Sequence, residues 1–174
     1  AIKNIFAIYN PDIIAVHTTC LSETIGDDLP TIIRQSEIPE GKRVIHTNTP
    51  SYSGSHITGF SNMVKSMISS LAEASEPVKK DQVNILPGFV NPGDMREIRR
   101  IVDEMGIHQI MLPDTTRVLD SPQTNQYTLF PEGGTRVDEI IDTGNSQLTL
   151  ALGSWASDAA GAMLVEKCKV PCIP

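Results

Sequence analysis

Short apolar runs alternate along the chain with stretches in which apolar residues recur every three or four positions. Residues 13–16 read Ile-Ile-Ala-Val and follow the turn signal Asn-Pro-Asp at 10–12, which is typical of a buried strand after a turn. Asp28 can then cap a helix that carries Ile32 and Ile33. The pattern predicts a strand followed by a helix.

The same order recurs toward the C-terminus. Further strands are expected from 44, over 83–86, 109–112 and 148–152, and from 169. Helices are expected over 2–9, 55–74, 91–106, 135–144 and 154–165. Thr135, with Asp138 three residues on, resembles a capping box, and Ser154 is expected to cap the last helix. Between Pro113 and Gly134 a polar loop carries no periodic pattern, and loops of this length usually serve function or an interface.

Repeated strand-helix units predict an α/β fold, in which a parallel sheet is covered by helices on both faces in a Rossmann-like arrangement. We expect two parts, residues 1–80 and residues 81–174, with the second incomplete at its C-terminal end. The chain lacks an initiating methionine and stops inside an expected strand. It is therefore expected to be a piece of a larger subunit.

Net charge, hydropathy and cysteine spacing exclude several classes of partner, location and cross-link. The 174 residues carry a formal net charge of -7, which argues against a nucleic acid or an anionic membrane as partner. No apolar stretch approaches the ~20 residues of a membrane helix, and no signal peptide is visible, so a cytoplasmic location is expected. The three cysteines, at 20, 168 and 172, do not form the pattern of a disulfide framework.

Two loops that follow expected strands carry the candidate chemistry. Residues 18–28 contain Cys20, and residues 49–56 contain Ser51 among other hydroxyl groups and a glycine. Working residues of parallel α/β proteins gather in such loops beyond the carboxyl ends of the strands. Neither loop has the glycine pattern of a phosphate-binding loop. From the residues alone, Cys20 is either a metal ligand or a small buried hydrophobic residue.

Two other motifs do not predict a catalytic or a zinc site. Ser55 and His56 are adjacent, so they do not face each other as nucleophile and base, and no nucleophile elbow is present. His17 and Cys20 lack the second ligand pair that a structural zinc site requires.

Long motifs of this chain resemble a known family. They are residues 11–20, 23–28, 49–52, 54–56, 58–60, 87–95 and 113–115. Together they resemble the β subunits of nitrogenase component 1. The sequence at 38–42 and 44–50 is most similar to the clostridial molybdenum-iron type. The resemblance covers essentially the whole chain, which would be the central segment of such a subunit.

The resemblance implies a metal site. The position of Cys20 ligates the P-cluster, an [8Fe-7S] electron relay shared with the α subunit, and the position of Ser51 binds the same cluster through oxygen when it is oxidised. No catalytic residue is implied in this chain. The ATP-hydrolysing iron protein would dock near four residues: Glu23, Ile25, Asp27 and Asp28.

The implied assembly is an α2β2 heterotetramer containing a second β subunit, and the implied reaction is ATP-dependent reduction of dinitrogen to ammonia. One thiolate and one hydroxyl cannot hold an eight-iron cluster, so the chain alone is expected to bind no cofactor and to be inactive. Two kinds of alternative stay open. The chain could come from a vanadium or iron-only nitrogenase or a cofactor-assembly scaffold, or it could be a non-catalytic, metal-free α/β binding domain.

Overall fold

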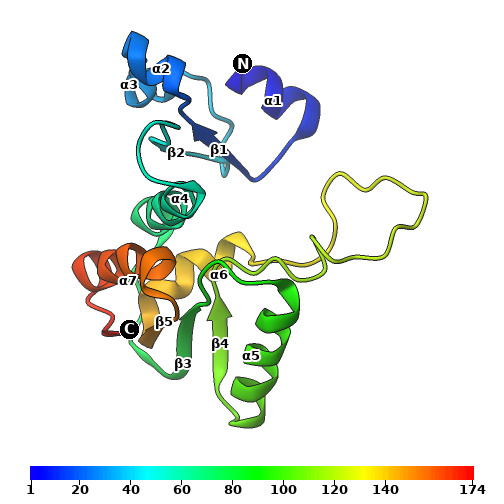
Figure 1. The fold of residues 1–174 in the computed structure, drawn as a ribbon, viewed down its shortest axis with the longest axis vertical. Coiled ribbons are helices and arrows are strands. Elements are labelled where there is room, and N and C mark those ends of the chain that lie inside the picture. The colour runs from blue at the N-terminus through cyan, green and yellow to red at the C-terminus, as the bar shows by residue number, and fades with distance from the viewer.

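Two parallel sheets, rather than one, organise the chain. The computed structural model describes all residues from 1 to 174 (Figure 1). The smaller sheet pairs β1 (Ile13–His17) with β2 (Arg43–Thr47). The larger sheet has the order β4-β3-β5-β6 and consists of β3 (Lys79–Leu86), β4 (His108–Met111), β5 (Ser146–Ala151) and β6 (Cys172–Ile173). All pairings are parallel, so the expected α/β class is confirmed, with the strands divided into two sets.

The helices separate and cover these sheets. They are α1 (Ile2–Tyr9), α2 (Cys20–Ile25), α3 (Leu29–Arg34), α4 (His56–Leu71), α5 (Pro92–Glu104), α6 (Val137–Asp142), the short 3-10 helix η1 (Thr143–Asn145) and α7 (Ser154–Cys168). Figure 1 shows α1, α2 and α3 around the smaller sheet at one end of the molecule, and α5 and α7 around the larger sheet at the other. Helix α4 lies between them, beside α7.

The larger sheet is buried on both faces because neighbouring residues of a strand point to opposite sides. Leu86 of β3 belongs to a core cluster of 14 buried residues that includes Leu164 of α7 and Ile68 of α4. Its neighbour Ile85 belongs to a second cluster on the other face, with Met95 of α5. The two helical layers of a doubly wound sheet are therefore both present.

A buried polar network ties β3 to β5 and to the turn before it. Asn84 is fully buried and donates from Nδ2 to the carbonyl of Thr143 (2.9 Å) and to Oγ1 of Thr149 (3.1 Å). Its Oδ1 accepts a hydrogen bond from Oγ of Ser146 (2.8 Å). Each polar atom of the Asn84 side chain thus has a partner inside the sheet, as burial requires.

Two expected caps were wrong. The backbone N–H of Arg136, not of Thr135, donates to the carboxylate of Glu139 (2.7 Å), and α6 starts one residue later than expected. The Thr135 hydroxyl is used elsewhere, because it donates to the carbonyl of Met111 (2.5 Å). Ser154 is the first residue of α7 and Gly153, with φ of 82°, holds the cap position.

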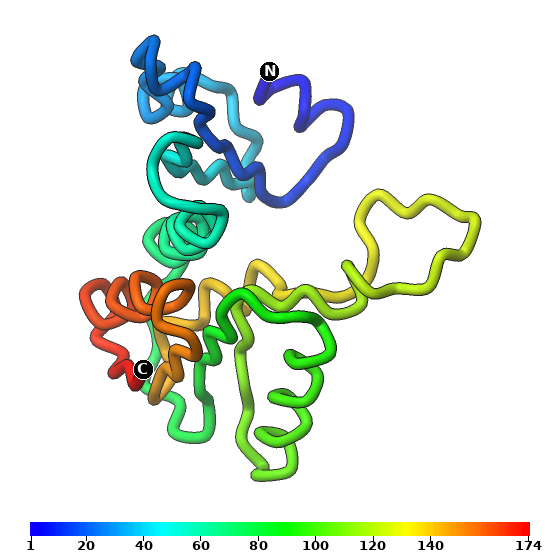
Figure 2. The backbone as a smooth tube through the Cα atoms, in the orientation of Figure 1, coloured from blue at the N-terminus to red at the C-terminus, as the bar shows by residue number.

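The long polar loop leaves the body of the molecule. Figure 2 shows it as a yellow-green excursion that projects beyond both sheets, between β4 and α6. Its base is held by Arg99, which pairs with the buried carboxylate of Asp114 at 2.5 Å. The division into residues 1–80 and 81–174 stays a prediction. No helix of the chain is both long and apolar enough to cross a membrane.

Candidate functional site

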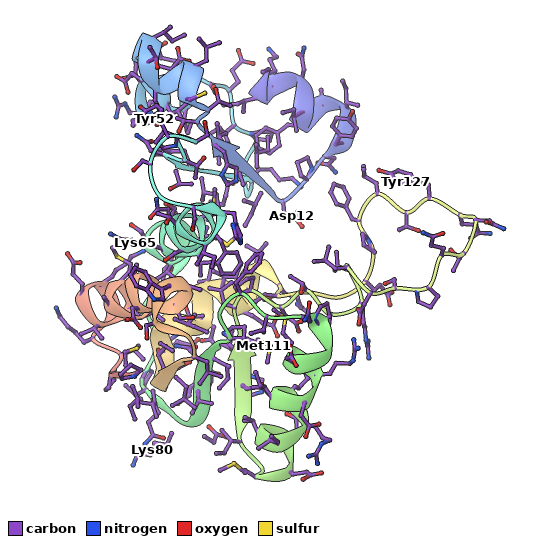
Figure 3. The ribbon with its side chains drawn as sticks, in the orientation of Figure 1. Asp12, Tyr52, Lys65, Lys80, Met111 and Tyr127 are labelled. Carbon is purple, nitrogen blue, oxygen red and sulfur yellow. The ribbon has the colours of Figure 1, made fainter.

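The candidate site lies at the carboxyl edge of the smaller sheet. The register pairs His17 with Thr47, so the chain leaves β1 and β2 at the same edge. Cys20 follows β1 as the first residue of α2, and Ser51 follows β2; both side chains are exposed. Figure 3 shows the neighbour of Ser51, Tyr52, at the end of the sheet where α2 lies. The structure therefore brings the two predicted site residues to one edge.

The Cys20 loop is ordered by a short helix that the sequence analysis missed. The Thr19 N–H donates to Oγ of Ser22 (2.8 Å), and the Ser22 N–H donates back to Oγ1 of Thr19 (3.4 Å). This reciprocal pair is a capping box in which serine stands in for the usual Glu or Gln, and its spacing was the available signal. The Thr24 hydroxyl donates to the Cys20 carbonyl (2.7 Å), so the backbone at Cys20 is fixed from both sides.

The Ser51 loop forms a turn and then begins α4. The Ser53 N–H donates to the Pro50 carbonyl (3.2 Å), which places Ser51 inside the turn. Gly54 has φ of 76°, and a Cβ there would lie 2.5 Å from Oγ1 of Thr58, so glycine is required for this entry into the helix. A cavity of about 320 Å³ opens here, and none of its lining side chains is hydrophobic.

Two threonines connect the loops. The Thr49 N–H donates to Oγ1 of Thr18 (2.8 Å), and the Thr49 hydroxyl donates to the Thr18 carbonyl (2.9 Å). The Thr18 N–H donates to the Thr47 carbonyl (3.3 Å), which extends the ladder of the sheet by one bond. Sequence reasoning missed this pair, because the spacing Thr-x-Cys after one strand and Thr-x-Ser after the next becomes informative only when the two strands are known to be neighbours.

The four residues expected near a docking surface differ in exposure. Ile25, Asp27 and Asp28 are exposed, whereas Glu23 is half-buried and its Oε1 is a buried atom without a hydrogen-bond partner. Asp28 caps α3, as expected, by accepting from the Thr31 hydroxyl (2.6 Å) and the Thr31 N–H (3.1 Å). These two hydrogen bonds hold the pKa of the Asp28 carboxyl below its ordinary value.

The other two cysteines lie apart from Cys20, in and after α7. Cys168 is buried and Cys172 half-buried, and burial raises the pKa of each thiol. Nowhere in the 174 residues do three His, Cys, Asp or Glu side chains gather in a geometry that could hold a metal ion. A thiol and a hydroxyl are nevertheless donors that iron accepts, so the pair fits a cluster completed by ligands from outside these residues.

The fold and the site together define a class: parallel α/β proteins that present an exposed thiol and an exposed hydroxyl in loops beyond the strand ends. The family follows from comparison. The chain belongs to the nitrogenase component 1 type oxidoreductases, whose family model matches residues 1–174.

Curated relatives agree with this assignment. The chain is 61% identical over 175 residues to the nitrogenase molybdenum-iron protein beta chain of Clostridium pasteurianum, which covers 98% of this chain and 38% of that protein. It is 38% identical over 163 residues to the beta chain of the same name from Azotobacter vinelandii, covering 88% of this chain and 31% of that protein. The chain thus spans well under half the length of these relatives.

Solved structures agree with the fold. A chain of the structure described as nitrogenase Cp1 at pH 6.5 superposes with a TM-score of 0.95 at 59% identity, over 99% of this chain and 38% of that chain. A chain of nitrogenase Cp1 at pH 5 superposes with a TM-score of 0.74 at 20% identity, which shows a shared fold only. The expected family and fold class are confirmed.

Proposed function

We propose that this chain acts within a nitrogenase molybdenum-iron protein beta chain and supplies Cys20 and Ser51 as ligands to its P-cluster, an [8Fe-7S] group shared with an α subunit. The observation that carries the proposal is the placement of an exposed thiol and an exposed hydroxyl at one edge of the smaller sheet, joined by the Thr18–Thr49 hydrogen bonds. Relatives that carry this beta-chain name support the family context.

The two side chains have different tasks in this proposal. When bound, an iron-sulfur group supplies one-electron transfer. Cys20 would hold iron as a thiolate, a soft donor that suits iron-sulfur chemistry. Ser51 would hold the same group through Oγ: its hydroxyl would release its proton to solvent, and the resulting hard anionic oxygen would suit more oxidised iron.

Exposed apolar side chains beside the site support a covering partner. Ile25, in the Cys20 loop, is 65% exposed, and Tyr52, next to Ser51, is 68% exposed. Apolar and aromatic residues of this kind are enriched in the cores of protein interfaces. We assign the Tyr52 side of this edge to contact with the α subunit, within an α2β2 heterotetramer that includes a second β subunit.

The proposed reaction of the whole assembly is ATP-dependent reduction of dinitrogen to ammonia in the cytoplasm. The ATP-hydrolysing iron protein is proposed to dock near Glu23, Ile25, Asp27 and Asp28, where three of the four side chains are exposed. Because the relatives are named as molybdenum-iron proteins, we favour that type over the vanadium and iron-only types. Metal analysis of the native complex checks this choice.

The decisive experiment replaces Cys20 by alanine in the complete complex. Because a ligand is removed, we expect fewer iron atoms per P-cluster site and a large loss of substrate reduction. Cys172→Ala is the matched control: it removes a thiol that lies outside the site, in β6, and should leave the iron content unchanged. Full iron occupancy in Cys20→Ala would refute the assignment.

A further inference from the structure

The two candidate ligands occupy equivalent positions relative to the threonine pair. Cys20 lies two residues after Thr18, and Ser51 lies two residues after Thr49. Two extended residues span at most ~7 Å, so each candidate ligand is tethered closely to its own threonine. Any bond between the threonines therefore restricts the relative position of the thiol and the hydroxyl.

Two hydrogen bonds join the threonines, and Thr49 donates both of them. Its backbone N–H donates to Thr18 Oγ1 and its hydroxyl donates to the Thr18 carbonyl. Neither strand extends this far, since the paired register of β1 and β2 ends at His17 and Thr47. Side-chain hydroxyls thus take over the role of the sheet ladder at the point where the site begins.

The environment of the pair favours persistent bonds. Thr18 is only 5% exposed, so water competes weakly for its hydroxyl. Thr49 is half-buried and lies beside Gly59 of α4, where a Cβ would be in ordinary contact, 3.6 Å from Thr49 Cγ2. The pair is therefore less exposed than Cys20 and Ser51, which both remain exposed.

Each loop is also ordered on its own side of the pair. The capping box of Thr19 and Ser22 fixes the start of α2, and the hydrogen bond from Ser53 to Pro50 fixes the turn around Ser51. Because hydrogen bonds between Thr18 and Thr49 join the two ordered loops, we expect the loops to move together. Removing these bonds should let the Cys20 loop and the Ser51 loop move independently.

We propose that Thr18 and Thr49 are positioning residues that hold the Cys20 and Ser51 loops as a single unit, so that the Ser51 oxygen remains able to act on iron bound at Cys20. This inference rests on the proposed function for the identity of the bound group. It assigns no metal contact to either threonine. The threonine pair sets the separation of the two loops through its hydrogen bonds.

The first test measures coupling without reference to metal. Hydrogen exchange of the complete complex is compared for wild type, Thr18→Val and Thr49→Val, in which valine keeps the shape and removes the hydroxyl. Thr18→Val should speed exchange in residues 48–53, and Thr49→Val should speed it in residues 19–25, by about tenfold or more. Thr24→Val is the matched control, because Thr24 bonds only to Cys20 within its own loop, and it should leave 48–53 unchanged. If the valine variants do not assemble, the same comparison is made on the isolated full-length subunit.

The second test measures the Ser51 proton. In wild type the oxidation midpoint of the bound cluster should depend on pH, and Ser51→Ala should remove that dependence. Thr49→Val should weaken it while keeping most of the iron, and Thr49→Ser, which restores the hydroxyl, should recover it. A merely structural role would lower iron content without changing the pH dependence of the clusters that remain.

The outcomes separate the two proposals. If Cys20→Ala and Ser51→Ala leave iron content and the pH dependence unchanged, the proposed function is wrong. If Ser51→Ala acts as expected but Thr49→Val retains the wild-type pH dependence, or if Thr18→Val leaves exchange in 48–53 unaltered, the positioning role is overturned and the assignment of Cys20 and Ser51 stands.

Discussion

The two sheets of this chain are built from the same kind of unit but differ in how far each is enclosed. In the larger sheet, Ile85 and Leu86 are each about 1% exposed and pack on opposite faces against α5 and α7. In the smaller sheet, only Ile14 and Ile45 of the ten strand residues are buried hydrophobic residues. The enclosed sheet provides most of the stabilising burial, and the open sheet carries the candidate ligands.

The polar groups of the two sheets also differ in whether their partners lie within the chain. Asn84 lies inside the larger sheet, where its hydrogen-bonding groups find partners within the chain. At the edge of the smaller sheet, Cys20 and Ser51 remain exposed and leave their donor atoms available to other molecules. The larger sheet thus satisfies its polar groups within the chain, whereas the edge of the smaller sheet leaves donor atoms for groups outside it.

The largest expected effect is in the core of the larger sheet. Leu164 of α7 is fully buried, so Leu164→Ala should remove packing, leave a cavity and cost about 4 kcal/mol of unfolding free energy. Urea denaturation of the chain measures this. Leu21→Ala is the matched control near the site: Leu21 is 67% exposed in α2, and its loss should cost less than about 0.5 kcal/mol. Equal losses in both variants would contradict the contrast between the sheets.

A somewhat smaller loss is expected from the polar network. Asn84→Ala leaves the Thr143 carbonyl and the Ser146 and Thr149 hydroxyls with fewer buried partners, which should cost about 2 to 3 kcal/mol. Denaturation midpoints measure the loss. Asn48→Ala, at an exposed position in the Ser51 loop, is the control and should change stability by less than about 0.5 kcal/mol. A neutral Asn84→Ala would show that the network does not stabilise the larger sheet.

Acid should lower the unfolding free energy by protonating Asp142, which pairs with Lys79 of β3. Burial acts to raise the pKa of Asp142, but hydrogen bonds from Asn145 and Lys79 outweigh it and hold that pKa below the ordinary value of 3.8. The carboxylate therefore stabilises the fold above pH ~4, and this contribution is lost as the pH falls through the lower folded-state pKa. The loss should be smaller than that of Asn84→Ala. Unfolding free energies of Asp142→Asn should show a flatter acid limb than wild type; an unchanged limb would exclude this pair as its cause.

The smallest effect is expected at the periphery of the smaller sheet. Lys3 of α1 pairs with Glu37 at 2.5 Å, but their side chains are 70% and 77% exposed. Water and salt screen such pairs, and holding two long side chains in one geometry has an entropic cost. Lys3→Ala should therefore leave the thermal midpoint unchanged within error. A clear drop would show that α1 depends on this pair more than its exposure implies.

The strand and helix pattern of the fold was predictable, because it depends on local signals. The helix expected over 91–106 is α5, Pro92–Glu104, since an Asn cap, a proline at the first position and a terminal glycine are all local. The division into two sheets was not predictable, because strand partners are selected by tertiary packing. Thr135 shows the same limit: its hydroxyl bonds to Met111, 24 residues away, and not to its own helix.

The candidate site was predictable in part. Cys20 and Ser51 could be placed beyond strand ends from the apolar runs and from resemblance to a family. The Thr18–Thr49 pair could not be identified as a joint, because the sequence does not say that β1 and β2 are neighbours in register. Once that register is known, the equal spacing of Thr18 to Cys20 and Thr49 to Ser51 becomes informative.

The three thiols differ in burial, so the rate at which each reacts with a thiol reagent can measure local opening of the structure around it. Cys20 is exposed, Cys172 half-buried and Cys168 buried, and the raised pKa of the last two keeps less of each thiol in the reactive thiolate form. Cys172 is also close-fitted, since a Cβ at Gly161 would lie 2.5 Å from its sulfur. An alkylating reagent should therefore modify Cys20 first, Cys172 more slowly, and the buried Cys168 only after local opening of α7. The relative labelling rates would therefore compare the exposed edge of the smaller sheet, at Cys20, with the enclosed larger sheet, at Cys168 and Cys172.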